Sequence, residues 1–171
     1  MIIHETDRLI LRHFDLNDAE CFYFLNKDEE VMRYTGDTAF SSIQESYDFI
    51  KNYDAYDKTG MGRWTIELKE NNQPIGWCGL KLHPNGMIDL GYRLHKNYWG
   101  KGIATEAAKV ALSVGFEQLQ LSEIIGRTAN DNLASIRVLE KIGMTFLKKA
   151  PCEGIIDSVY YRIKKQEYLN L

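Results

Sequence analysis

The chain has 171 residues, of which 44% are hydrophobic and 26% are charged, and its net charge is −3. This length and composition predict a single domain over residues 1–171. The weakly acidic balance argues against general nucleic-acid binding, and no segment approaches the ~20 apolar residues of a membrane helix. The N-terminal segment MIIHETDRLILRHFD lacks the apolar core of a secretory signal, so we expect a cytoplasmic protein without a membrane or nucleic-acid partner.

The cysteines and histidines give no sign of a metal or disulfide site. Cys21, Cys78 and Cys152 are far apart and odd in number, which is typical of reduced, buried thiols. The histidines lack the spacing of metal ligands, so we expect no metal. No heptad pattern argues for a dimer, and the oligomeric state stays open.

The first third of the chain is predicted to contain one strand and two helices. The apolar run at residues 9–11 indicates a strand, and the Asp and Asn residues that follow it are suited to cap a helix over residues 15–26. Ser42 and Glu45 match a capping box, which indicates a second helix over residues 43–50.

The rest of the chain alternates between strand and helix patterns. Residues 64–68, 75–82 and 88–94 alternate apolar and polar side chains, separated by turn residues, and predict an antiparallel meander. Helices are expected after residue 102 and after Asn132, the latter ended by Gly143. Further strands are expected at residues 124–128, 145–148 and 158–163, which gives an α+β order.

The segment NYWGKGIATEA, residues 97–107, carries two glycines immediately before a helix. It is not a P-loop, because Gly102 stands where serine or threonine would bind magnesium, and Thr105 replaces the third glycine of a dinucleotide fingerprint. The backbone N–H groups from Trp99 to Ala104 are instead suited to bind a pyrophosphate at the helix N-terminus. A tight turn without a ligand is the alternative.

Four motifs in this order resemble the GNAT acetyltransferase superfamily: LGYRL at 90–94, YWGKGIATEA at 98–107, NDNLAS at 130–135 and VLEKIGM at 138–144. The opening TDRLILR at residues 6–12 is similar to the Rim-type branch, which includes ribosomal-protein N-terminal acetyltransferases. The resemblance implies a GNAT-like acyl-CoA N-acyltransferase fold. Its mixed, mostly antiparallel sheet would be flanked by helices and splayed between the fourth and fifth strands.

The resemblance also implies acetyl-CoA as cosubstrate. The family loop pattern falls on Trp99, Gly102 and Ala104, where Trp99 departs from the usual polar residue. Asn132 matches a cofactor-bonding asparagine, and a plain helix cap explains it equally well. The residues expected to bind the cofactor are Leu94, Trp99, Gly100, Lys101, Gly102, Ile103, Ala104, Thr105 and Asn132.

Catalysis requires an acid for the leaving thiolate and a base for the amine. The family tyrosine that often serves as the acid is replaced by Leu139, and Ser135 is the substitute expected from some Rim-type relatives. Asp89 is the first candidate base, Glu67 the second, and a chain of water molecules is a third option.

The expected activity is transfer of the acetyl group of acetyl-CoA to a primary amine by direct attack. The branch resemblance favours a protein N-terminal α-amine. A small amine, such as an amino acid, polyamine or antibiotic, is the alternative, and Leu139 keeps open a non-catalytic acyl-CoA-binding module. The segment 33–40 and the aromatic residues Tyr34, Phe40, Tyr47 and Trp64 are candidates to line the acceptor side.

Overall fold

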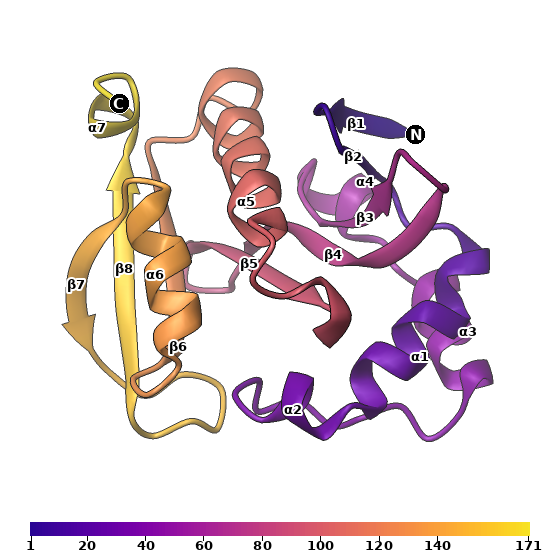
Figure 1. Ribbon diagram of the computed structural model, residues 1–171. Coiled ribbons are helices and arrows are strands. Elements are labelled where there is room, and N and C mark those ends of the chain that lie inside the picture. The colour runs from indigo at the N-terminus through magenta and orange to yellow at the C-terminus, as the bar shows by residue number, and fades with distance from the viewer.

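The computed structural model describes residues 1–171 as one eight-stranded sheet in the order β1-β2-β3-β4-β5-β6-β8-β7 (Figure 1). Neighbouring strands are antiparallel except for β5 and β6. The strands are β1 Ile2–Glu5, β2 Leu9–Arg12, β3 Arg63–Leu68, β4 Gln73–Leu82, β5 Ile88–Leu94, β6 Glu123–Ala129, β7 Thr145–Lys149 and β8 Ser158–Lys164. The predicted mixed sheet is confirmed, and only the exposed edge strand β1 was not predicted.

The helices connect and cover these strands. They are η1 Leu16–Asp18, α1 Ala19–Lys27, α2 Glu29–Met32, α3 Ile43–Lys51, α4 Ala55–Thr59, η2 Lys96–Tyr98, α5 Ile103–Ser113, η3 Val114–Gln118, α6 Leu133–Lys141 and α7 Lys165–Tyr168. Helices α5 and α6 contact each other in front of the strands in Figure 1, and α1 packs against α3 at the right. None of these helices combines the length and apolar character needed to cross a membrane.

The two sheet faces are covered by different helices, because side chains alternate along each strand. On β4, Cys78 and Leu80 belong to the large core under α5, whereas the neighbouring Trp77 packs against the small core of α1 and α3. Trp64 is buried in the large core, so it cannot line the face covered by α1. That expectation was wrong, since the strand alternation directs Trp64 toward α5.

Local caps explain where the helices begin and end. Asp15 forms a capping box with Asp18 ahead of α1, and the Ser42 side chain accepts a hydrogen bond from the N–H of Glu45. The predicted capping box at Ser42 is only half formed, because the Glu45 carboxylate bonds Ser41 instead. Gly143 has φ +93° directly after α6, as expected of a residue that ends a helix.

Strands β5 and β6 separate after a short paired segment. Their parallel ladder joins only Asp89 with Ile125 and Leu90 with Gly126. The N–H of His95 bonds the carbonyl of Ile75 on β4. Because the backbone groups of successive residues in a strand point to opposite sides, those of Tyr92 and Leu94 point toward β6, with which they form no ladder hydrogen bonds. We call this site the strand opening, and it confirms the predicted splay between the fourth and fifth predicted strands.

Candidate active site

The loop before α5 presents a row of unpaired amides. Gly100 and Gly102 have φ +71° and +75°, a conformation that glycine adopts without the cost of a Cβ. None of the N–H groups of residues 100–105 donates to another group of the protein. We call these six groups the loop amides. They lie at the positive end of the α5 dipole, which suits them to bind an anion.

Trp99 does not belong to this row. Its backbone N–H donates to the carbonyl of Lys96 at 3.0 Å, so the row starts one residue later than predicted and ends at Thr105. The indole Nε1 of Trp99 donates to the carbonyl of Leu94 at 2.9 Å. Trp99 therefore ties the end of β5 to the loop, and only its half-exposed ring is free to contact a cofactor.

The start of α6 faces the strand opening. The Asn132 side chain accepts a hydrogen bond from the N–H of Ser135 and so caps the helix. The Tyr92 hydroxyl of β5 donates to Ser135 Oγ at 3.1 Å. Burial raises the pKa of Tyr92 to about 12, so this hydroxyl keeps its proton at neutral pH. Leu139, one helical turn further on, is buried and packs on Gly126, away from this pair.

Asp89 lies in a buried ionic cluster at the base of the strand opening. Its Oδ2 is 3.1 Å from His83 Nε2, 3.0 Å from Arg127 Nη2 and 3.7 Å from Arg63 Nη2. Burial would raise the pKa of Asp89, but the hydrogen bond with His83 and the charges of Arg63 and Arg127 outweigh it and lower the pKa to about 2. Such a carboxylate is a weak base, and its contacts favour a role in holding the arginines. Glu67 is also paired, with Arg12 at 2.7 Å.

Three arginines cover the sheet face opposite α5, and we call them the arginine cluster: Arg63, Arg93 and Arg127. Arg63 and Arg93 both lie over the Trp77 ring, at 4.4 and 5.2 Å from its centroid. Arg63 Nη1 and Arg127 Nε are buried without a hydrogen-bond partner. Unpaired buried donors of this kind are costly unless a ligand satisfies them.

Two loops from distant parts of the chain meet over the arginine cluster. Asp37 pairs with Arg93 at 2.5 Å, and Glu153 pairs with Arg127 at 3.3 Å. Gly36 approaches the Glu153 carbonyl so closely that an added Cβ would lie 2.3 Å from its oxygen. Figure 1 shows this meeting at the bottom, where the chain after α2 reaches the loop between β7 and β8. We call these segments, residues 33–42 and 150–157, the acceptor loops.

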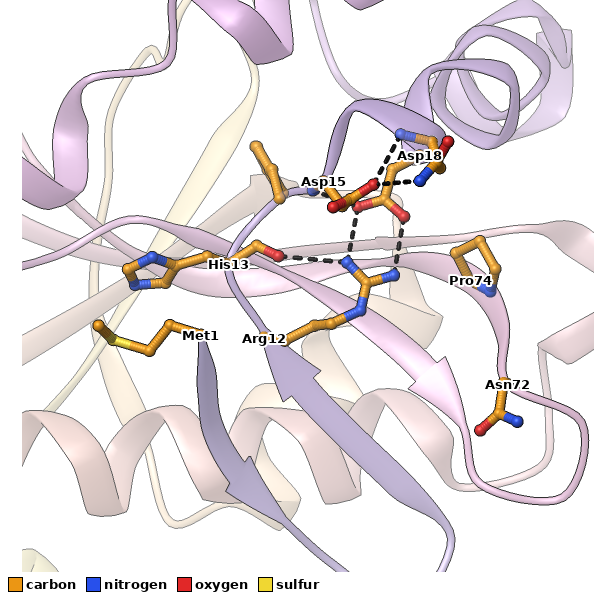
Figure 2. A pocket seen from close by; sticks show the side chains of 9 residues that line it. Met1, Arg12, His13, Asp15, Asp18, Asn72 and Pro74 are labelled. Atoms are coloured by element: carbon orange, nitrogen blue, oxygen red, sulfur yellow. Dashed lines mark hydrogen bonds and ion pairs between the residues drawn. The ribbon is translucent and has the colours of Figure 1, made fainter.

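Two surface cavities lie away from the strand opening. Figure 2 shows one of about 360 Å³, where Arg12 donates two hydrogen bonds to the buried Asp18, so its charged groups already satisfy each other. A second, of about 380 Å³, contains Cys21 and His95, whose Sγ and Nε2 atoms are 3.3 Å apart. Burial raises the pKa of Cys21 to about 12, so the pair holds a neutral thiol and no nucleophilic thiolate.

An unpaired strand edge beside a row of free amides suits an extended ligand with an anionic end. The family model described as an acetyltransferase (GNAT) domain matches residues 8–145, and the chain belongs to this family. It is therefore an acetyl-CoA-dependent N-acetyltransferase, and several of its relatives are named as N-acetyltransferases.

The relatives cover nearly the whole chain. The chain is 32% identical to an uncharacterized N-acetyltransferase, p20, of Bacillus licheniformis, over 95% of this chain and 96% of that protein. It is 25% identical to the spermidine N(1)-acetyltransferase of Escherichia coli K12, over 88% and 80% of the two chains.

Solved structures agree with this fold. A GNAT-family acetyltransferase from Bacillus anthracis matches with a TM-score of 0.80 and 28% identity, over 97% of this chain and 99% of that one. A putative ribosomal-protein-serine acetyltransferase from Vibrio cholerae matches with a TM-score of 0.77 and 18% identity, over 94% and 95%, which supports the fold alone.

Sequence reasoning missed the arginine cluster and the contact of Tyr92 with Ser135. Arg63 and Arg93 stand at strand positions that alternate with core residues, which is a signal for one shared face. Nothing in the sequence indicated the register in which β3 and β5 pair with β4, and this register places the two arginines on either side of Trp77. Tyr92 stands at an apolar position of the alternating pattern in residues 88–94, and its ring does pack against the core while its hydroxyl reaches α6.

Proposed function

We propose that this protein acetylates the α-amine of a protein N-terminus by direct attack on acetyl-CoA. The observation that carries the proposal is that both carboxylates predicted as a base, Asp89 and Glu67, are held in ion pairs. Both lie on the sheet face opposite α5, which carries the arginine cluster and which we propose as the acceptor face. Because carboxylates held in ion pairs are weak bases, the site fits an acceptor amine that loses its proton at neutral pH without a general base. The Rim-type branch, suggested by residues 6–12, is consistent with this acceptor.

The pKa of the acceptor amine separates the two acceptor classes. An α-amine has a pKa of about 7.7–8.0, so roughly a tenth of it is neutral at pH 7. An alkylamine such as a lysine or polyamine nitrogen has a pKa of about 10.4, and less than about 0.1% is neutral. We propose that the amine loses its proton to water, without Asp89 as the base.

The charge of the acceptor face also favours this acceptor. The side chains of Arg93 and Arg127 are only 10% and 8% exposed, whereas their partners Asp37 and Glu153 are 52% and 49% exposed. The inner part of the face is therefore cationic, with Asp89 as its buried counter-charge. A polycation would be repelled there, and peptide carbonyl or carboxylate groups would satisfy the unpaired guanidinium N–H groups.

The loop amides and the strand opening are proposed to hold acetyl-CoA. The amides of residues 100–105 suit its pyrophosphate, and the backbone groups of Tyr92 and the N–H of Leu94 suit the amides of its pantetheine arm. The Leu94 N–H, or a neighbouring one, would stabilise negative charge that develops on the carbonyl oxygen of the thioester. Acetyl-CoA supplies the acetyl group as a thioester that a neutral amine can attack.

Ser135 is proposed as the acid. When the C–S bond breaks and the C–N bond forms, Ser135 would donate its proton to the leaving sulfur and regain one from water through the Tyr92 hydroxyl. The 3.1 Å contact between these hydroxyls supports this path. Asn132 would hold Ser135 at the start of α6 through its cap.

A small-molecule amine is the second candidate acceptor. The close meeting of the acceptor loops at Gly36 and Glu153 favours it, because a peptide chain requires these loops to part. The relative from Escherichia coli is named for spermidine, which makes a polyamine the first small molecule to test.

The decisive experiment is an acceptor panel read by mass spectrometry. It would include peptides with free N-termini, the same peptides with blocked N-termini and one internal lysine, and spermidine. We expect acetylation of the free α-amines, with kcat/KM rising as pH passes the acceptor pKa. Preferential acetylation of spermidine or of the internal lysine would contradict the α-amine proposal and leave the family assignment intact.

A further inference from the structure

The N-terminal motif TDRLILR contacts the loop that we propose to bind the pyrophosphate. Thr6 and Arg8 lie between β1 and β2, far in sequence from residues 101–106. Arg8 Nη1 donates to the carbonyl of Lys101 at 3.0 Å, and Arg8 Nε and Nη2 donate to Glu106 Oε2 at 2.8 and 2.5 Å. One guanidinium thus bonds the chain on both sides of Gly102.

Thr6 completes the network from the other side. Its hydroxyl donates to Glu106 Oε1 at 2.5 Å, so both oxygens of this carboxylate are engaged by the N-terminal segment. Thr6 Oγ1 also accepts the N–H of Leu9 at 2.9 Å, and Leu9 is fully buried in the main core. The network therefore anchors the first turn of α5 to the start of β2, whose Leu9 lies in the main core.

The bond to Lys101 orients an amide of the loop. In a trans peptide, the carbonyl of Lys101 and the N–H of Gly102 point in opposite directions. Because Arg8 holds that carbonyl, the Gly102 N–H is directed away from Arg8 and stays available to a ligand. The pairing also neutralises Glu106, which would otherwise place a negative charge in the first turn of α5, where the anion binds.

We infer that Thr6, Arg8 and Glu106 are positioning residues that hold the loop amides in the orientation required by the pyrophosphate of acetyl-CoA. This inference rests on the proposed cofactor site. The three residues act through the loop backbone, and the chemistry at the thioester does not involve them. Of the three residues, Arg8 contributes most to the position of the loop, because it alone bonds both Lys101 and Glu106.

The test compares acetyl-CoA with acetyl-pantetheine, which carries the same thioester but no pyrophosphate. For Arg8→Ala, we expect the Kd of CoA and the KM of acetyl-CoA to rise about five- to tenfold, as for loss of partly exposed charged hydrogen bonds. The KM of acetyl-pantetheine and the kcat at saturation should stay unchanged. Arg8→Lys should lose most of the same affinity, because an ammonium cannot bond both partners as the planar guanidinium does.

Glu5→Gln is the matched control. Glu5 belongs to the same N-terminal hairpin and pairs with Lys69 at 2.8 Å, and its side chain is 48% exposed, against 49% for Arg8. It should leave both KM values unchanged. Glu106→Gln provides a second variant should Arg8→Ala fail to fold, and it should weaken CoA binding while sparing acetyl-pantetheine.

Three results would overturn the inference. Unchanged CoA affinity in both the Arg8 and Glu106 variants would remove the network from cofactor binding. An equal loss for acetyl-CoA and acetyl-pantetheine would indicate general damage to the domain. If the unaltered protein does not bind CoA in calorimetry, the proposed cofactor site is wrong and the inference falls with it. If the unaltered protein binds CoA and the variants bind it equally well, only the inference about the network is wrong.

Discussion

The two sides of the strand opening differ in the kind of atoms that form them. On the cofactor side, backbone amides of one continuous segment, residues 100–105, face the place proposed for the pyrophosphate. On the acceptor side, side chains from several separate strands and loops meet, among them Arg63, Arg93 and Arg127. A backbone site tolerates many side chains, whereas a side-chain site changes with each substitution. The cofactor side therefore suits a ligand common to the family, and the acceptor side suits a ligand that varies within it.

The largest expected effect concerns Ser135, which lies between the two sides. Ser135→Ala should lower kcat about a hundredfold, in the range for loss of a general acid, with little change in acetyl-CoA affinity. Tyr92→Phe should give a smaller loss, because it removes the hydroxyl that donates to Ser135. Steady-state kinetics with varied acetyl-CoA concentration separate the change in kcat from the change in the KM of acetyl-CoA.

Tyr161→Phe is the control for that pair. The Tyr161 hydroxyl also reaches α6, where it contacts Glu140 at 3.3 Å, but it lies away from Ser135. Its removal should leave kcat unchanged. Unchanged turnover in Ser135→Ala would exclude Ser135 as the acid and assign protonation of the thiolate to water.

The second-largest expected effect is that of Asp89→Asn, which tests whether Asp89 acts as a base or holds the arginine cluster in place. Its pKa lies at about 2, below the ordinary 3.8, so ionised Asp89 stabilises the fold above pH 3.8 and this contribution is lost as pH falls toward 2. At pH 7, Asp89→Asn should lower the free energy of unfolding by about 2–4 kcal/mol, because it leaves buried arginines unpaired. Urea denaturation at several pH values would measure this, with less acid dependence in the variant.

Asp54→Asn is the matched control, since Asp54 pairs with Lys58 on the surface at 58% exposure and should change stability little. A hundredfold loss of kcat in a folded Asp89→Asn, with stability unchanged, would contradict the anchor role. That result would return Asp89 to the base predicted from the sequence.

The glycine loop before α5 and its unpaired amides could be predicted from the sequence because their signals are local. The glycine spacing and the start of the apolar helix pattern are both contained in residues 97–107. The row of free amides differs from the prediction at Trp99, whose N–H bonds Lys96 and closes a 3-10 turn that the glycine pattern does not encode, and it extends one residue further, to Thr105. The strands other than β1, and the helix ends at Ser42, Asn132 and Gly143, were predicted for the same reason, since alternation and capping residues act over a few positions.

The acceptor side could not be predicted, because it depends on which distant segments meet. Asp89 was chosen for its place on a strand, but its pKa, which burial alone would raise, is lowered by a hydrogen bond with His83, 6 positions away, and by the charges of Arg63 and Arg127, 26 and 38 positions away along the chain. The contact of Gly36 with Glu153 joins loops more than a hundred residues apart. Nothing in the local pattern of either loop encodes this meeting.

A smaller effect tests whether the cofactor side depends on backbone conformation. Gly102→Ala should weaken acetyl-CoA binding about tenfold, because a Cβ strains φ +75° and shifts the loop amides. Gly86→Ala is the control, as Gly86 has φ +83° in the open turn between β4 and β5. Both variants should lose similar stability in thermal unfolding, and calorimetry should show weaker CoA binding only for Gly102→Ala. Equal CoA affinity in the two would refute the loop amides as the pyrophosphate site.

The smallest effect addresses the acceptor loops. Asp37→Ala removes a half-exposed partner from Arg93 and leaves the arginine cluster more cationic. The KM of an acceptor peptide with an acidic second residue should fall about threefold, and that of a peptide with a lysine there should rise about as much, the size expected of an exposed ion pair.

The acetyl-CoA KM should not change in Asp37→Ala. Glu123→Ala is the control variant, because it removes an exposed partner of Arg162 on a distant part of the sheet, and it should change the KM of neither acceptor peptide. Opposite shifts for the two peptides would place the arginine cluster in contact with the acceptor. Equal shifts would mean that Asp37 acts only through loop closure, and the charge argument against a polycation would then fail. Because the same variant is read with two acceptors of opposite charge, its effect on folding cancels in the ratio of the two KM values.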